Sequence, residues 1–376
     1  MSIVKNAPFY FDIVGSFLRP EKLKEARVKY ENKEITKEEL KVVEDECIKD
    51  LIEKQKKAGL QVITDGEFRR SWWHLDFMWG LKGIAKVEVE KGYSFNGKET
   101  RAESAAVTGK ISGENHPFVE HFKYVKLFET EGVIARQTIP APAQLLAEIQ
   151  RNTGENKASI YYLDEEELIK DIVDAYQTVI RDLYESGCRN VQLDDCTWGM
   201  FCDTKYWEAR QNGAVSLSKL ADQYVTINNL AIANLPEDLV ITTHVCRGNY
   251  HSAWASQGGY APIADELFGK ENVSAYYLEF DDNRSGDFEP LLKVSGDKKV
   301  VLGLITSKSP KLEDKELIKA RIEEAKKYIP LERLCLSPQC GFASTEEGNI
   351  LTEDEQWNKI KLVKEIAEEV IISSFS

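Results

Sequence analysis

A histidine and a cysteine, His244 and Cys246, stand two residues apart in the stretch THVCRGNY. The apolar run Leu239–Ile241 precedes them, which places them at the end of a predicted strand. Residues i and i+2 of a strand point to the same face, so the imidazole and the thiol emerge side by side. Such a pair is either half of a metal site or a core cysteine beside an ordinary histidine.

Two further residues of metal-binding type, Glu279 and Cys340, also end predicted strands. Zinc takes four ligands from Cys, His and carboxylate side chains. In an α/β barrel the carboxyl ends of the strands meet at one rim, where the chemistry is built. The sequence therefore predicts one zinc site with four ligands: His244, Cys246, Glu279 and Cys340. Taken singly, each residue has an ordinary alternative as a small buried cysteine or a surface glutamate.

The donor set of this predicted site favours thiol chemistry. Two thiolates and a carboxylate make a zinc site net anionic and a poor activator of water. A zinc hydrolase instead uses histidines and carboxylates with an open water position. Zinc deprotonates a bound thiol, and electron-rich ligands keep its sulfur nucleophilic. The ligand set therefore points to alkyl transfer onto a thiol.

Three other strand-end residues suit an amino-acid substrate. The buried carboxylates of Glu67 and Asp194 could hold an ammonium group. The turn around Gly15 and Ser16 could present a backbone N–H and a hydroxyl to the substrate's carboxylate. Their ordinary alternative is helix capping or a structural ion pair.

Alternating strand-like and helix-like segments predict a (β/α)₈ barrel of the α/β class, formed by residues 1–376 as a single domain. An open doubly wound sheet is the alternative, but no GxGxxG or GxxxxGK[ST] motif supports it. Five helices are predicted with a period near 3.6: Glu38–Ala58, Glu165–Ser186, Leu217–Asn234, Glu313–Tyr328 and Asp354–Ile372. Eight strands are predicted: Phe9–Phe17, Leu60–Glu67, Ala135–Pro142, Asn190–Cys196, Leu239–Cys246, Val273–Phe280, Lys299–Ser307 and Arg333–Cys340.

Two segments are too long for simple connections. Residues 80–134 contain two strand-like runs around Asn96-Gly97, which predicts a hairpin inserted after the second strand. Residues 197–215 form an aromatic-rich loop after the fourth strand, and long loops of this kind are usually functional lids.

The bulk properties exclude several classes of function. The 376 residues carry a formal net charge of −14, which argues against nucleic-acid binding. No membrane span and no signal peptide is predicted. The odd, scattered set of seven cysteines is typical of a reduced, cytoplasmic protein.

Six stretches in order along the chain resemble the cobalamin-independent methionine synthases, specifically their C-terminal catalytic barrel and its short, single-barrel bacterial branch. They are IVGSFLRP, DGEFRR, NVQLDD, HVCRGN, YLEFDD and SPQCGF. The resemblance implies zinc at His244, Cys246, Glu279 and Cys340. It also implies homocysteine contacts at Ser16, Glu67 and Asp194, and 5-methyltetrahydrofolate or a related methyl donor.

The chain departs from the family's pattern after the seventh strand. Long members of the family have a proposed proton-donor histidine there, whereas this chain has Lys308. An ammonium group can donate a proton if its pKa is lowered. The family's folate-facing tryptophan has no clear counterpart in PAPAQLLAEI, so Trp72, Trp73 and Trp198 are alternatives for stacking on the donor.

The predicted function is zinc-dependent methyl transfer to homocysteine, giving methionine. Alkyl transfer involving another thiol, such as a coenzyme thiol, is the main alternative. A zinc hydrolase and a non-catalytic zinc-binding barrel are two further ones. The sequence leaves the identity of the donor and the oligomeric state open, a homo-oligomer included.

Overall fold

The computed structural model describes residues 6–152, 156–210 and 216–375. Its centre is a six-stranded sheet in which every neighbouring pair is parallel, in the order β12-β11-β10-β9-β8-β7. Nearly every residue of these strands is buried, as expected for a parallel sheet covered on both faces, and buried polar side chains such as Asn190, Gln192 and Thr242 are among them. The strands are β7 (Gln137–Pro140), β8 (Asn190–Asp194), β9 (Val240–Val245), β10 (Ala275–Glu279), β11 (Lys299–Ile305) and β12 (Leu334–Pro338).

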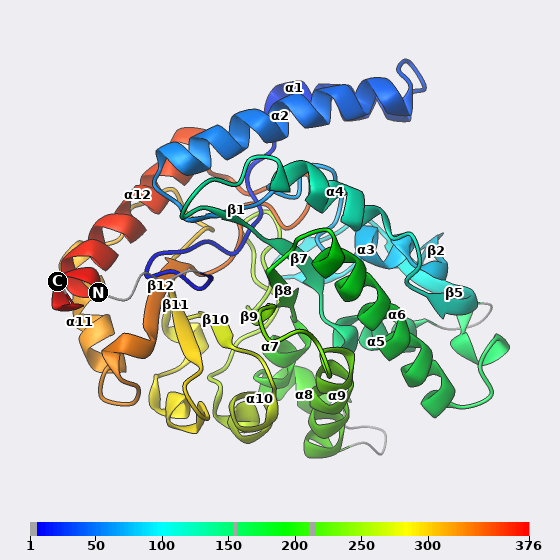
Figure 1. The fold of residues 1–376 in the computed structure, drawn as a ribbon. Helices are drawn as coiled ribbons and strands as arrows, with labels where there is room; N and C mark the ends of the chain where they lie inside the picture. Colours follow the sequence, from blue (N-terminus) through cyan, green and yellow to red (C-terminus); the bar gives the residue numbers. More distant parts are fainter. Residues whose placement is uncertain (1–5, 153–155, 211–215, 376) are drawn as a thin grey trace.

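Both edges of this sheet continue into the N-terminal part of the chain. At one edge, β6 (Ile134–Ala135) leads into β7 and pairs in parallel with β1 (Val62–Ile63). At the other edge, Phe11 makes a parallel bridge to Leu336 of β12. The helices lie outside the strands (Figure 1). The result is an α/β architecture in which eight parallel chain segments present their carboxyl ends on the same side.

The first of these segments is not the regular strand predicted over residues 9–17. Of its residues, Phe11 alone forms a bridge. The Asp12 carboxylate accepts hydrogen bonds from the backbone N–H groups of Phe9 and Ile13, at 3.0 and 2.7 Å, which diverts the chain from a ladder. Gly15 then takes a φ of +144°, a conformation that side-chain-bearing residues rarely adopt. The chain therefore bends just before Ser16.

The five predicted helices form, with ends that differ by a few residues. Their starts follow from capping: Thr36 and Thr352 each form a capping box, and Ser216 accepts a hydrogen bond from the first turn of its helix. No helix in the described part of the chain combines the length and apolar character needed to cross a bilayer. The five are α2 (Lys37–Lys57), α6 (Glu165–Glu185), α9 (Leu217–Ala231), α11 (Lys315–Ala325) and α12 (Glu353–Val370).

Other helices had no clear sequence signal. The N-terminal α1 (Glu21–Glu31) buries only Leu23 and Ala26, too few apolar residues for a visible period. The rest are short: α3 (Leu75–Gly80), α4 (Pro117–Lys126), α5 (Pro142–Arg151) and α10 (Ala264–Lys270).

Residues 80–134 contain antiparallel pairings, unlike the central sheet. The strand β2 (Lys82–Glu88) pairs with β5 (Glu103–Ser112), and β3 (Ser94–Phe95) pairs with β4 (Lys98–Glu99) across Asn96-Gly97. The Asn96 N–H donates to the Trp254 carbonyl at 2.8 Å, which ties this turn to the loop after β9. That this segment is a hairpin inserted after the second strand stays a prediction.

The aromatic-rich loop predicted over 197–215 is partly helical. It contains α7 (Thr197–Phe201) and α8 (Thr204–Arg210). Its last residues, 211–215, lie outside the described residues.

A buried acid beside the sheet gives the fold a pH dependence. The Asn228 Nδ2 donates to Glu271 Oε1 at 3.0 Å and to Asp195 Oδ2 at 2.9 Å. Burial, and then the charge of Asp195, raise the pKa of Glu271 to about 8. The folded state therefore holds a proton that the unfolded chain releases near its ordinary pKa of 4.5. The free energy of unfolding should fall as the pH rises from that value to about 8.

We expect the Glu271→Gln variant to lose this dependence, because an amide keeps the size and does not titrate. Between pH 6 and 9 the wild-type protein should lose roughly 3 kcal/mol of stability through this group. Urea unfolding at both pH values measures the difference, with exposed Glu237→Gln as the matched control. An equal loss in wild type and Glu271→Gln would contradict the assignment.

Candidate metal and substrate site

Three of the four predicted metal ligands lie together at the carboxyl ends of the strands. One ligand atom from each of His244, Cys246 and Cys340 lies within 4.8 Å of the other two, and all three residues are buried. The strand β9 carries His244 and ends one residue before Cys246, while Cys340 follows β12. A histidine and two cysteines are ligands that zinc prefers.

The orientation of the His244 ring fits metal binding. Its Nδ1 lies 3.1 Å from the Tyr277 carbonyl oxygen, which can only accept a hydrogen bond. The proton therefore belongs on Nδ1, which leaves the lone pair on Nε2. That Nε2 is buried and has no hydrogen-bond partner among the described residues. Metal-bound histidines commonly donate their other N–H to a carbonyl in this way.

The two thiols of the cluster are buried and close to each other. Contact with Cys196 and burial raise the pKa of the Cys246 thiol. Contact with Cys246 and burial likewise raise the pKa of the Cys340 thiol. A bound dication reverses this preference because it stabilises the thiolate form. The residues present therefore fit a zinc ion.

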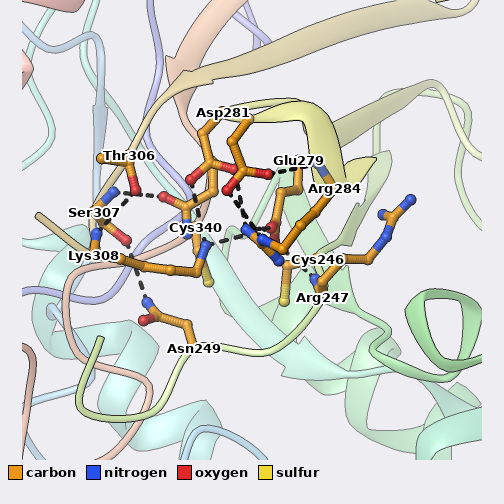
Figure 2. A network of polar contacts seen from close by, with 12 residues as sticks. Cys246, Arg247, Asn249, Glu279, Asp281, Arg284, Thr306, Ser307, Lys308 and Cys340 are labelled. Carbon is orange, nitrogen blue, oxygen red and sulfur yellow. Dashed lines mark hydrogen bonds and ion pairs between the residues drawn. The ribbon is translucent and has the colours of Figure 1, made fainter. Parts of the chain in front are cut away.

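Glu279, the predicted fourth ligand, ends β10 at the same rim but is held by cations (Figure 2). Its Oε2 accepts from the Arg247 backbone N–H at 2.8 Å. Its Oε1 lies 3.0 Å from an Arg284 nitrogen and 3.3 Å from Lys308 Nζ. Burial opposes ionisation, but neighbouring positive charges outweigh it and lower the pKa of this carboxyl. Glu279 is not part of the three-residue cluster, and its role as a ligand stays a prediction.

Lys308 lies between two carboxylates. Its Nζ is 3.3 Å from Glu279 Oε1 and 3.5 Å from Asp281 Oδ2, and its side chain is 8% exposed. Burial lowers the pKa of Lys308, but the two carboxylates outweigh burial and raise it. The lowered pKa that a proton donor needs is therefore not found. That role of Lys308 stays a prediction, with the ion pairs as its observed contacts.

Glu67 and Asp194 are two buried carboxyl groups close enough to interact. Burial raises the pKa of Glu67 to about 7, and the charge of Asp194 adds to this while Arg70 opposes it. Burial also raises the pKa of Asp194 to about 7. Glu67 Oε1 accepts from the Thr138 hydroxyl at 3.1 Å, while Oε2 has no partner among the described residues. Two carboxyls with spare acceptor capacity suit a cation that arrives with a ligand.

Ser16 reaches this site because of the bend before it. It lies against Gly341, where an added Cβ would stand 1.9 Å from the Ser16 hydroxyl oxygen, so only glycine fits there. The Ala343 N–H donates to the same hydroxyl at 3.3 Å. The close approach joins the first and last segments of the barrel at the rim.

One cavity of about 530 Å³ joins the two groups of residues. Six predicted site residues line it, whereas Glu279 and Lys308 do not. Aromatic side chains form much of its wall, with Trp72, Trp73, Tyr93 and Phe95 among them, but buried Trp198 is not part of the lining. The six are Ser16, Glu67, Asp194, His244, Cys246 and Cys340.

The arginines near Glu279 were not predicted from the sequence as site residues. Arg247 and Arg284 each lie in a loop shortly after a strand-end ligand, in HVCRGN and FDDNRSG. An arginine in a loop is usually a surface residue, so its position alone gave no signal. The structure buries Arg247 and stacks it 4.0 Å from the centre of the Tyr260 ring.

Comparison with known proteins gives a family match over most of the chain. Residues 11–368 match the family described as "Cobalamin-independent synthase, Catalytic domain". The uncharacterized protein YxjH of Bacillus subtilis is 44% identical over 368 residues, 97% of this chain and 96% of that protein. A methionine synthase of Saccharolobus solfataricus is 24% identical over 335 residues, 88% of this chain and 87% of that one.

Two solved structures have the same fold. A Listeria monocytogenes protein, described provisionally as a vitamin-B12-independent methionine synthase, has a TM-score of 0.76 at 40% identity, covering 97% of this chain and 98% of its own. A B12-independent methionine synthase from Shewanella, in complex with selenomethionine, has a TM-score of 0.75 at 19% identity, covering 98% and 99%.

Proposed function

Because the chain belongs to the family of cobalamin-independent synthase catalytic domains, we propose that it transfers a methyl group to the thiol of homocysteine and so makes methionine. The observation that carries this proposal is the joint cavity. A His-Cys-Cys cluster of zinc-binding type opens into the same space as the buried carboxyls of Glu67 and Asp194. Arg70 lies 3.3 Å from Glu67 Oε1, but Glu67 Oε2 has no partner among the described residues. A thiol and an ammonium group on one small molecule would satisfy both.

His244, Cys246 and Cys340 would hold zinc, with Glu279 as the predicted fourth ligand. Bound zinc would supply thiol activation, by favouring the thiolate form of the substrate. The Tyr277 carbonyl occupies Nδ1 of His244, which leaves Nε2 free for the metal. Arg247, Arg284 and Lys308 would keep Glu279 ionised at the rim.

The ammonium and carboxylate groups of homocysteine would bind to the opposite wall of the cavity. Glu67 and Asp194 would take the ammonium group, since an incoming cation removes the repulsion between them. Ser16, at the bend beside Gly341, would donate its hydroxyl proton to the substrate carboxylate. Together these contacts would orient the substrate sulfur toward the cluster. Holding the reactants in one geometry lowers the entropy cost of the reaction.

The methyl donor would occupy the aromatic part of the cavity. A flat ring such as that of 5-methyltetrahydrofolate suits a wall that contains Trp73, Tyr93 and Phe95. The approach is in line from the thiolate to the methyl carbon, and the enclosing aromatic wall excludes water. All seven cysteines are free thiols, which supports a reducing compartment such as the cytoplasm.

The test is methionine formation by the zinc-loaded protein from L-homocysteine and 5-methyltetrahydrofolate. We expect turnover that requires both substrates and disappears after chelation. Parallel reactions replace homocysteine with 2-mercaptoethanesulfonate, and the folate with methylcobalamin. Transfer only to the sulfonate thiol would overturn homocysteine as the acceptor. Transfer only from methylcobalamin would overturn the folate but keep the acceptor.

A further inference from the structure

A third cysteine stands beside the proposed zinc ligands. The Sγ atom of Cys196 lies 3.6 Å from the Sγ atom of Cys246. Cys196 follows β8, and its side chain lines the same cavity as Cys246 and Cys340. It is the one cysteine of the seven that is not fully buried. A small oxidant that enters the cavity therefore meets Cys196 and Cys246 in contact, with the ligand Cys340 as the other neighbour of Cys246.

The strand register brings these two cysteines opposite each other. Asp194 of β8 pairs with His244 of β9, and the Asp195 N–H donates to the His244 carbonyl at 2.9 Å. Cys196 and Cys246 each come two residues after this pair, beyond the ends of β8 and β9. Their Sγ atoms are 3.6 Å apart, against an S–S bond length of about 2.05 Å.

We propose that Cys196 is the resolving partner of Cys246, and that peroxide converts the pair into a disulfide that removes one zinc ligand and reversibly closes the thiol site. The inference rests on the proposed function for the zinc, although the pairing itself needs only the two thiols. No role in methyl transfer is assigned to Cys196.

The chemistry balances with a peroxide as the oxidant. The Cys246 thiolate attacks one peroxide oxygen, the O–O bond breaks, and Cys246 becomes a sulfenic acid while the other oxygen leaves as hydroxide and takes a proton from the solvent. The sulfur of Cys196 then attacks the Cys246 sulfur, and the S–S bond forms as the S–O bond breaks. The departing hydroxide takes the Cys196 proton and leaves as water. Two thiols supply two electrons, and a dithiol returns them.

This arrangement protects the site as well as closing it. A sulfenic acid without a neighbouring thiol proceeds to sulfinic acid, which dithiols do not reverse. With Cys196 in contact, the first oxidation product is captured as a disulfide. The released metal and the disulfide are both recoverable.

The test treats the zinc-loaded full chain with one equivalent of hydrogen peroxide. We expect release of the bound zinc, loss of two thiols per chain and a linked Cys196–Cys246 peptide in mass mapping. Dithiothreitol and added zinc should restore zinc binding. The Cys196→Ser variant should bind zinc normally but, with two equivalents of peroxide, lose it to sulfinic acid at Cys246, without recovery. Cys202→Ser, in the same loop, is the matched control and should behave as wild type.

The proposal is overturned if wild type gives no linked peptide, or if Cys196→Ser recovers as fully as wild type. Should Cys196→Ser fail to fold, Cys196→Ala and the wild-type peptide map decide the question. A protein that forms the disulfide but binds no zinc would overturn the proposed function and keep the pairing. The two failures are therefore distinguishable.

Discussion

Replacing Cys340 with serine is expected to abolish methyl transfer and leave the protein without bound zinc. Its sulfur forms the cluster together with the His244 imidazole and the Cys246 sulfur, and a hydroxyl is a far poorer zinc ligand than a thiolate. Removing a residue that hydrogen-bonds to a zinc ligand lowers zinc affinity by about 10- to 100-fold. Removing the ligand itself should therefore lower zinc affinity by more than about a hundredfold.

Metal analysis after dialysis measures this effect, together with the rate of methionine formation. Cys335→Ser is the matched control, because Cys335 lies on β12, the strand that Cys340 follows, is also buried and is outside the cluster. The control should retain zinc and activity. A Cys340→Ser protein that keeps a full equivalent of zinc would contradict the assignment of the metal site.

Neutralising either carboxyl of the ammonium site is expected to weaken the use of homocysteine strongly. Glu67→Gln and Asp194→Asn keep the size of the side chain but remove the charge that would pair with the substrate's ammonium group. Both residues are buried, so the remaining cation would stand poorly paired in a low-dielectric site. Breaking a buried ion pair costs about 3–5 kcal/mol, which corresponds to a fall in kcat/KM of roughly a hundredfold or more.

A thiol substrate without the amino group separates this effect from general damage. Wild-type protein should use 4-mercaptobutyrate poorly, and the two variants should use it about as well as wild type does. Zinc content should stay unchanged, because neither residue belongs to the cluster. An equal fall in kcat/KM for both thiols would show that Glu67 and Asp194 do not recognise the ammonium group.

The strand ends were predictable because buried parallel strands leave continuous apolar runs in the sequence. Each run fixes where its strand stops, and the first polar residue after it must face the rim. That reasoning placed His244, Cys246 and Cys340 together before any contact was known. It also placed Ser16, Glu67 and Asp194 around the cavity that those ligands line.

The contacts that depend on loops were not predictable in this way. The segment before Ser16 has the composition of a strand, but the Asp12 carboxylate takes two backbone N–H groups out of the ladder. The ion pair between Glu279 and Arg284 depends on how the loop that carries Arg284 folds back toward β10. Secondary-structure propensities and hydrophobic periodicity do not indicate which residues distant in sequence a loop will contact.

The most direct test of the account is X-ray absorption at the zinc edge of the loaded protein, recorded with and without L-homocysteine. The account predicts that the number of sulfur ligands rises from two to three when homocysteine binds. That result would establish homocysteine as the thiol that the site activates. A shell that keeps two sulfurs at saturating homocysteine would contradict the central claim, even if the metal site itself were correct.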